Sequence, residues 1–126
     1  MENSPKPPSL QSFIAAYIGS VEQLEILCLL SRSPDKWWSP KDVFHVVQSS
    51  EHSVTACLEK YVQQTLLVAD KGLYRYAPRR LELDKAVHEL SQAYSERRVA
   101  VIEMIYKRPN DTIQDFADAF RFRKEK

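Results

Sequence analysis

The stretch 53–68, SVTACLEKYVQQTLLV, carries the clearest hydrophobic pattern in the chain. Five apolar side chains follow the spacing i, i+3, i+4, i+7 and i+8 of one helix face. They are Val54, Cys57, Leu58, Tyr61 and Val62. The period changes at 66–68, which predicts a strand, and Gly72 then supplies the positive φ of a tight turn. We therefore expect a helix over about 52–64 that leads into a hairpin of 66–69 and 73–77.

Two more helices are predicted before this one. Ser20 opens the capping box SVEQ, with Gln23 as its second member, and starts a helix that runs to about residue 32. Ser39 and Pro40 start the next helix as N-cap and first helical residue. That helix is expected to end near 48, and its apolar face consists of Val43, Phe44, Val46 and Val47.

Trp37 and Trp38 stand between these two helices and predict a short extended segment. Neighbouring residues of a strand point to opposite sides, so one Trp is expected to be buried and the other exposed. The exposed Trp is a candidate contact surface, and a packing role under the wing is the favoured alternative.

An apolar stripe also marks the N-terminal arm, where Leu10, Phe13, Ile14, Tyr17 and Ile18 predict a short amphipathic helix that ends at Gly19. We expect it to pack on its own subunit, and a position across a second subunit is the alternative.

The region after the hairpin predicts one long helix from Leu81 to about 107, with a heptad-like stripe interrupted by Arg97. The stripe is the candidate interface of a homodimer, and packing along the chain's own domain is the alternative. It consists of Leu83, Val87, Leu90, Tyr94, Val101 and Met104. From Val99 onward the pattern is apolar nearly all round, so this half is expected to be buried on more than one side. A last short helix is predicted from Ile113, Phe116, Ala117 and Phe120.

These elements predict a mainly α fold with a small β-hairpin: a winged helix-turn-helix with a helical arm before it and helices after it. The expected regions are an N-terminal arm over 1–19, the winged helix-turn-helix domain over 20–80, and a C-terminal helical dimerisation region over 81–126.

The residues Ser53-Val54, Leu58, Tyr61 and Leu66-Leu67-Val68 resemble a pattern of winged helix-turn-helix transcriptional regulators such as the MarR-like and PadR-like groups. The match covers roughly 20–77. It implies a bacterial-type regulator, commonly a dimer, with its third helix in the major groove of double-stranded DNA. Thr65 stands where that pattern has a left-handed glycine, which predicts a different turn between helix and strand.

Charge gives this hypothesis limited support. The net charge is +1, and the segment 32–80 carries eight basic against five acidic side chains. The candidate DNA contacts are Lys41, His52, Ser53, Thr55, Lys60, Gln63, Lys71, Arg75, Arg79 and Arg80. Glu59 lies on the same outer face, and the third helix has no Arg, the usual reader of guanine. The alternative is a winged helix that binds a protein partner through its wing, its long helix or the Trp37-Trp38 pair.

Other classes of function are not favoured. His45, His52 and His88 are scattered, and two glycines do not make a phosphate loop, so no enzyme, cofactor or metal is expected. Cys28 and Cys57 predict buried thiols. A small-molecule sensor lined by Tyr94, Tyr106 and Phe116 is a variant of the regulator hypothesis. The chain has neither an apolar run of about 20 residues nor a secretory signal, so we expect a cytoplasmic protein without a membrane partner.

Overall fold

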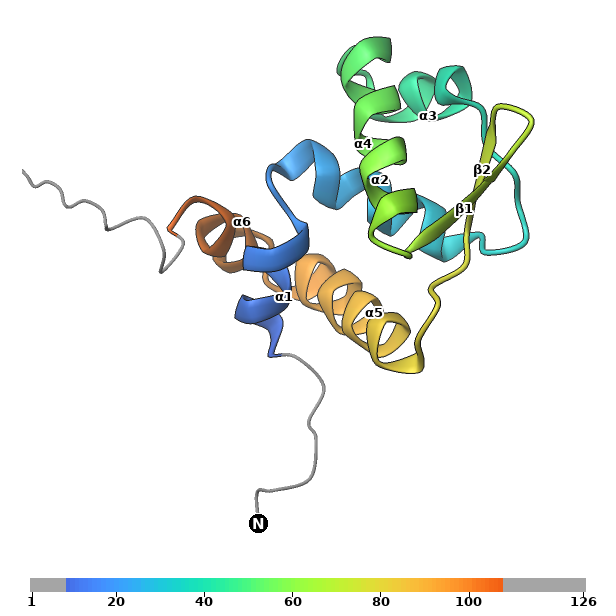
Figure 1. Cartoon of the computed structure of the whole chain (residues 1–126). Helices are drawn as coiled ribbons and strands as arrows, with labels where there is room; N and C mark the ends of the chain where they lie inside the picture. Colours follow the sequence, from blue (N-terminus) through green and yellow to red (C-terminus); the bar gives the residue numbers. More distant parts are fainter. Residues whose placement is uncertain (1–8, 108–126) are drawn as a thin grey trace, which may run out of the picture.

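The computed structural model describes residues 9–107, and within this range the chain forms six helices and one two-stranded antiparallel hairpin (Figure 1). The helices are α1 Leu10–Tyr17, α2 Val21–Arg32, α3 Pro40–Val47, α4 Glu51–Gln63, α5 Leu81–Glu96 and α6 Arg98–Tyr106. The strands are β1 Leu67–Asp70 and β2 Leu73–Tyr76. The expected mainly α chain with a small hairpin is confirmed. The predicted helix from Ile113 to Phe120 lies outside the described residues.

The N-terminal arm packs on its own chain. Helix α1 contacts α5 and α6, and its Phe13 and Ile14 are buried. The Ser20 hydroxyl caps α2 by accepting a hydrogen bond from the N–H of Gln23 at 3.2 Å. The Gln23 side chain does not complete the predicted box: it accepts from the N–H of Gly19 at 2.7 Å and so closes the turn between α1 and α2.

Helix α3 begins at Pro40, as its sequence predicts. The Ser39 hydroxyl accepts from the N–H of Asp42, and the Asp42 carboxylate accepts from the N–H of Ser39, which lowers the pKa of Asp42. Val43 is buried, but Val46 is 57% exposed, so its assignment to the apolar face was wrong. Val43, Phe44 and Val47 define the side that meets the core, and Val46 lies beyond the edge of that side.

Helix α4 buries the predicted face, Val54, Cys57, Leu58 and Tyr61, with Val62 half-buried. Burial raises the pKa of the Cys57 thiol to about 12.

Thr65 ends α4 in the left-handed conformation, with φ of +65°. The N–H of Leu66 bonds the carbonyl of Tyr61, and the N–H of Thr65 bonds that of Val62, each at 3.0 Å. This is a Schellman ending, which glycine favours. The expectation of a different turn was therefore wrong, because a β-branched residue adopts the glycine conformation here despite its steric cost.

The hairpin turns through Lys71 and Gly72, which both have positive φ, as a type I′ turn requires. In its register Val68 faces Arg75 and Asp70 faces Leu73. The predicted extended segment is confirmed on the other side of β2, where the backbones of Trp38 and Tyr74 exchange two hydrogen bonds of 2.8 Å. The order across this small sheet is thus Trp38, β2, β1.

The single long helix predicted over 81–107 is instead two helices. The chain breaks at Arg97, with φ of −137° and ψ of +61°. Figure 1 shows α6 turned away from α5 and placed beside α1. Because Arg97 falls on the apolar stripe, a continuous helix would carry a cation into the core. The break leaves Arg97 exposed and still buries Val101 and Ile105.

The buried apolar side chains of all these elements form one core cluster. In the part of the chain that the structure describes, no single helix is long and apolar enough to cross a bilayer. Helices α1 and α2 together meet such a criterion by length and composition, but a bend of 107° separates them.

Candidate interaction surfaces

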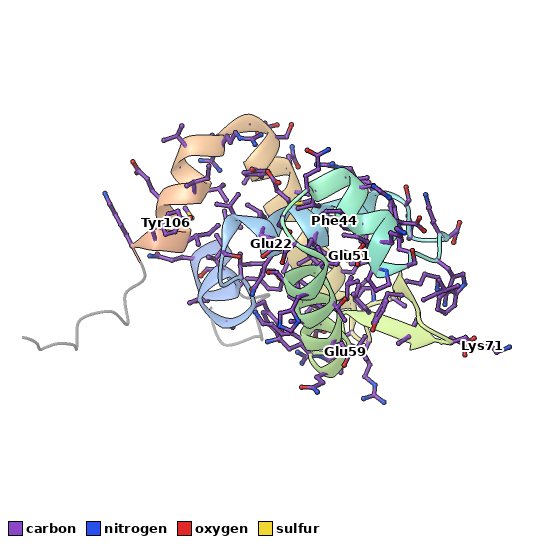
Figure 2. All side chains as sticks on the ribbon, turned by 90° about the horizontal axis from the view of Figure 1, so that it is seen from above. Glu22, Phe44, Glu51, Glu59, Lys71 and Tyr106 are labelled. Atoms are coloured by element: carbon purple, nitrogen blue, oxygen red, sulfur yellow. The ribbon has the colours of Figure 1, made fainter. Side chains whose placement is uncertain are left out.

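The outer face of α4 was the predicted DNA-reading surface, and Figure 2 shows Glu51 and Glu59 on this helix. Both acidic side chains are exposed. One Glu59 oxygen accepts a hydrogen bond from the Tyr74 hydroxyl at 2.8 Å. Burial raises the pKa of that hydroxyl, and the Glu59 carboxylate adds to the rise, so the donor keeps its proton. The sheet therefore holds Glu59 in place on α4.

Lys60 was predicted to contact phosphate, but its ammonium group points into the chain. It donates to the Gln23 Oε1 at 2.6 Å and to the Tyr17 carbonyl at 3.0 Å. The Tyr61 hydroxyl reaches the same Tyr17 carbonyl at 3.2 Å. Lys60 thus fastens α4 to the turn between α1 and α2.

Ser53, another candidate for base contacts, is also engaged within the fold. Its hydroxyl donates to the carboxylate of Glu22 on α2 at 2.6 Å, and the hydroxyl of Ser49 donates to the other oxygen of that carboxylate. The Thr55 hydroxyl donates to the Glu51 carbonyl one turn earlier. His52 and Gln63 therefore remain as exposed candidates on α4.

Four basic candidates outside α4 are exposed: Lys41 on α3, Lys71 in the turn, and Arg79 and Arg80 after β2. Figure 2 shows Lys71 at the tip of the hairpin, pointing away from the rest of the chain. These four residues do not share an element with His52 and Gln63 of α4. They lie on α3, in the hairpin turn and on the segment that leads to α5.

The outer face of the sheet carries a different set of side chains. Alternation along the strands puts Tyr74 and Tyr76 in the core and turns Arg75 and Leu73 outward. Val68 is the cross-strand partner of Arg75, and Trp37 lies on its other side, with the guanidinium carbon 4.9 Å from the ring centroid. Trp37, Val68 and Leu73 are 36%, 36% and 37% exposed. We call Trp37, Val68, Leu73 and Arg75 the sheet patch.

Arg75 is held at the centre of this patch without a counter-charge. Its guanidinium stacks on Trp37, and its Nε is buried with no hydrogen-bond partner. Ion pairs join His88 to Asp84 and Arg98 to Glu25, and among residues 9–107 none is found at Arg75. The sequence indicated that one of Trp37 and Trp38 would be an exposed contact and that Arg75 would be a phosphate ligand. It did not indicate that Arg75 stacks on Trp37.

The stripe predicted as a dimer interface is used inside the chain. Leu83, Val87, Leu90, Tyr94 and Val101 are buried in the core, and Met104 is half-buried beside it. For these residues the structure favours the alternative, packing along their own domain. The homodimer itself stays a prediction. The outer side of α6 does not meet the expectation of burial on several sides, since Val99 and Tyr106 are 69% and 65% exposed.

A small hollow of about 190 Å³ lies beside Tyr94, between α2, α3, α5 and α6. Glu25 accepts there from the Tyr94 hydroxyl at 2.9 Å and from Arg98 at 3.3 Å. Tyr106 does not line this hollow, and Phe116 lies outside the described residues. The three aromatic residues of the sensor hypothesis are therefore not seen around one pocket.

Comparisons with protein-family models, with curated proteins and with solved structures found no match to this chain.

Proposed function

We propose that the chain is a winged helix-turn-helix module that binds another protein through its sheet patch. In this assignment α2, α3 and α4 are the three helices, β1 and β2 the wing, and the Trp38 segment the short first strand. The element order and the pairing of Trp38 with β2 support the assignment.

The observation that carries the proposal is the sheet patch itself. Three of the exposed large hydrophobic side chains surround one arginine on the outer face of the sheet. Trp and Arg are the residue types that dominate binding energy in protein interfaces, and a compact apolar patch on a soluble domain commonly marks a contact site. The outer face of α4 lacks the basic character that DNA binding requires, because Lys60 points inward and Glu51 and Glu59 point outward.

The test is site-specific photo-crosslinking of the full chain in its native cells. A photo-reactive residue at Leu73 reports on the sheet patch, and the same residue at the exposed Ala56 reports on α4. We expect a protein adduct from position 73 that disappears when Trp37→Asp is added, and no such adduct from position 56. Protein adducts that are equal from both positions, or unaffected by Trp37→Asp, would contradict the proposal.

DNA binding is the second candidate, and the exposed Lys41, Lys71, Arg79 and Arg80 favour it. If these four side chains contact phosphates, affinity for duplex DNA falls with salt at a log-log slope of about −3.6. A titration of labelled duplex in a salt series measures the slope, and Lys71→Glu is expected to make it shallower by about 0.9. Absence of binding at low salt excludes this candidate.

A further inference from the structure

Arg75 has a buried polar atom without a hydrogen-bond partner in apolar surroundings, and this arrangement is unfavourable unless a ligand supplies the partner. Its Nε is buried without a partner, and its neighbours on the outer face are apolar: Val68 across the ladder, Leu73 along the strand and Trp37 beside it. A buried N–H without an acceptor is unfavourable, and the contact with Trp37 offsets only part of this cost. The stacking also fixes the guanidinium in one direction, so less side-chain entropy is lost when a ligand binds it.

We infer that Arg75 is the receptor for a carboxylate of the partner, in a short protein segment where Asp or Glu stands between apolar residues. This inference rests on the proposed function and names the chemistry that the sheet patch selects. A carboxylate matches the planar guanidinium in a two-bonded arrangement. The apolar neighbours of that carboxylate would cover Trp37, Val68 and Leu73.

A duplex phosphate fits the same surface less well. Phosphate supplies the negative charge, but the sugar-phosphate backbone offers only small C–H surfaces on the sugars to three hydrophobic side chains that are each about one-third exposed. Protein interfaces place apolar and aromatic groups around such an arginine. The apolar surroundings of Arg75 therefore favour a protein carboxylate.

The charges around the patch also indicate where the carboxylate sits. Lys71 follows in the turn, so the hairpin end of the patch carries a positive group. Asp70 is the acidic side chain on the same face, opposite Leu73. We place the partner's carboxylate on the Trp37 side of Arg75, away from Asp70.

The test uses random peptides displayed on phage, selected against the full chain and depleted against its Trp37→Asp variant. We expect the enriched peptides to share an Asp or Glu flanked by apolar residues. In fluorescence anisotropy with a synthetic copy, replacing that acid by its amide should weaken binding at least tenfold. This step leaves the protein unchanged, so it does not depend on how any variant folds.

A charge reversal at Arg75, paired with one in the peptide, then tests whether Arg75 contacts the peptide acid. Arg75→Glu should weaken the acidic peptide at least tenfold and restore binding of a peptide with Lys at the acidic position. Lys41→Glu makes the same charge change outside the patch and should have little effect. Three results would each overturn the inference while the proposed function stands. They are enriched peptides that contain no acid, an amide replacement that does not weaken binding, and failure of the Lys peptide to bind Arg75→Glu. If the selection yields no peptide that binds the full chain and not its Trp37→Asp variant, the proposed function fails as well. Duplex binding that Arg75→Glu abolishes would assign the arginine to phosphate.

Discussion

The outer face of α4 and the outer face of the sheet lie on neighbouring elements, but their polar groups are matched differently. On α4, Lys60, Ser53 and Glu59 all have partners on other elements of the chain. On the sheet, Arg75 has an aromatic neighbour and no counter-charge. The comparison shows that these polar groups of α4 belong to the scaffold, whereas on the sheet the buried Nε of Arg75 has no hydrogen-bond partner within the described residues.

The largest expected effect is on the pH dependence of stability, and it comes from Cys57 on the buried side of α4. The Cys57 thiol ionises near pH 9 in the unfolded chain, whereas burial raises its pKa to about 12 in the fold. Its contribution to stability is complete below pH 9 and is lost as the pH rises from 9 to 12, by up to about 1.4 kcal/mol per unit. Urea unfolding across this window should show the loss, and Cys57→Ala should reduce its slope.

Arg75→Met is the matched control for this pH series, because an arginine keeps its charge throughout the window. The slope of stability against pH should not change in that variant. An unchanged slope in Cys57→Ala would instead assign the alkaline loss to other groups, such as Tyr61, whose pKa burial also raises.

The next effect compares one cation from each surface. Lys60→Met removes two hydrogen bonds from a charged donor and is expected to lower the free energy of unfolding by about 2 kcal/mol. Arg75→Met loses no hydrogen bond and should lower it by less than about 0.5 kcal/mol, because the lost contact with Trp37 is offset by removal of a buried N–H that has no acceptor. Urea unfolding of both variants measures the difference. Equal losses would remove the distinction between a scaffold cation and a binding cation.

Thr65 joins the two surfaces, and its backbone predicts a gain in stability. Thr65→Gly relieves a positive φ at a β-branched residue and should stabilise the chain by about 1 kcal/mol. Thr65→Ala removes the same side-chain atoms beyond Cβ but keeps the steric problem, so it should give little gain. Thermal unfolding of the two variants separates these cases, and a gain of the same size in both would contradict the role assigned to φ.

The smallest effect concerns the link between the surfaces. Tyr74→Phe removes the hydrogen bond to Glu59 and is expected to lower stability by about 0.5 to 1 kcal/mol, since Glu59 is exposed and water replaces the donor. If DNA binding is real, it should not improve in this variant, because the Glu59 charge remains. A duplex titration of Tyr74→Phe beside Glu59→Gln checks this point, and improvement is expected in Glu59→Gln alone.

Much of the fold could be predicted from short-range patterns. The buried face of α4, the start of α3 at Ser39 and Pro40, and the turn at Gly72 follow from apolar spacing, capping and φ preference. The candidate site was predictable only in part. Strand alternation indicated that one of Trp37 and Trp38 would be exposed, while the stacking of Arg75 on Trp37 depends on a register that no local pattern specifies.

Apolar spacing, capping and turn preference therefore predicted most of the helices, the buried face of α4 and the hairpin turn, because these depend on neighbours within a few positions. Packing between distant elements set three other features: the Lys60 side chain turns toward Tyr17 and Gln23, the helix breaks at Arg97, and Arg75 lies between Val68 and Trp37. The long side chains of Lys60 and Arg75 can point in several directions. Their direction is set by groups that are distant in the chain and become neighbours only when the core has formed.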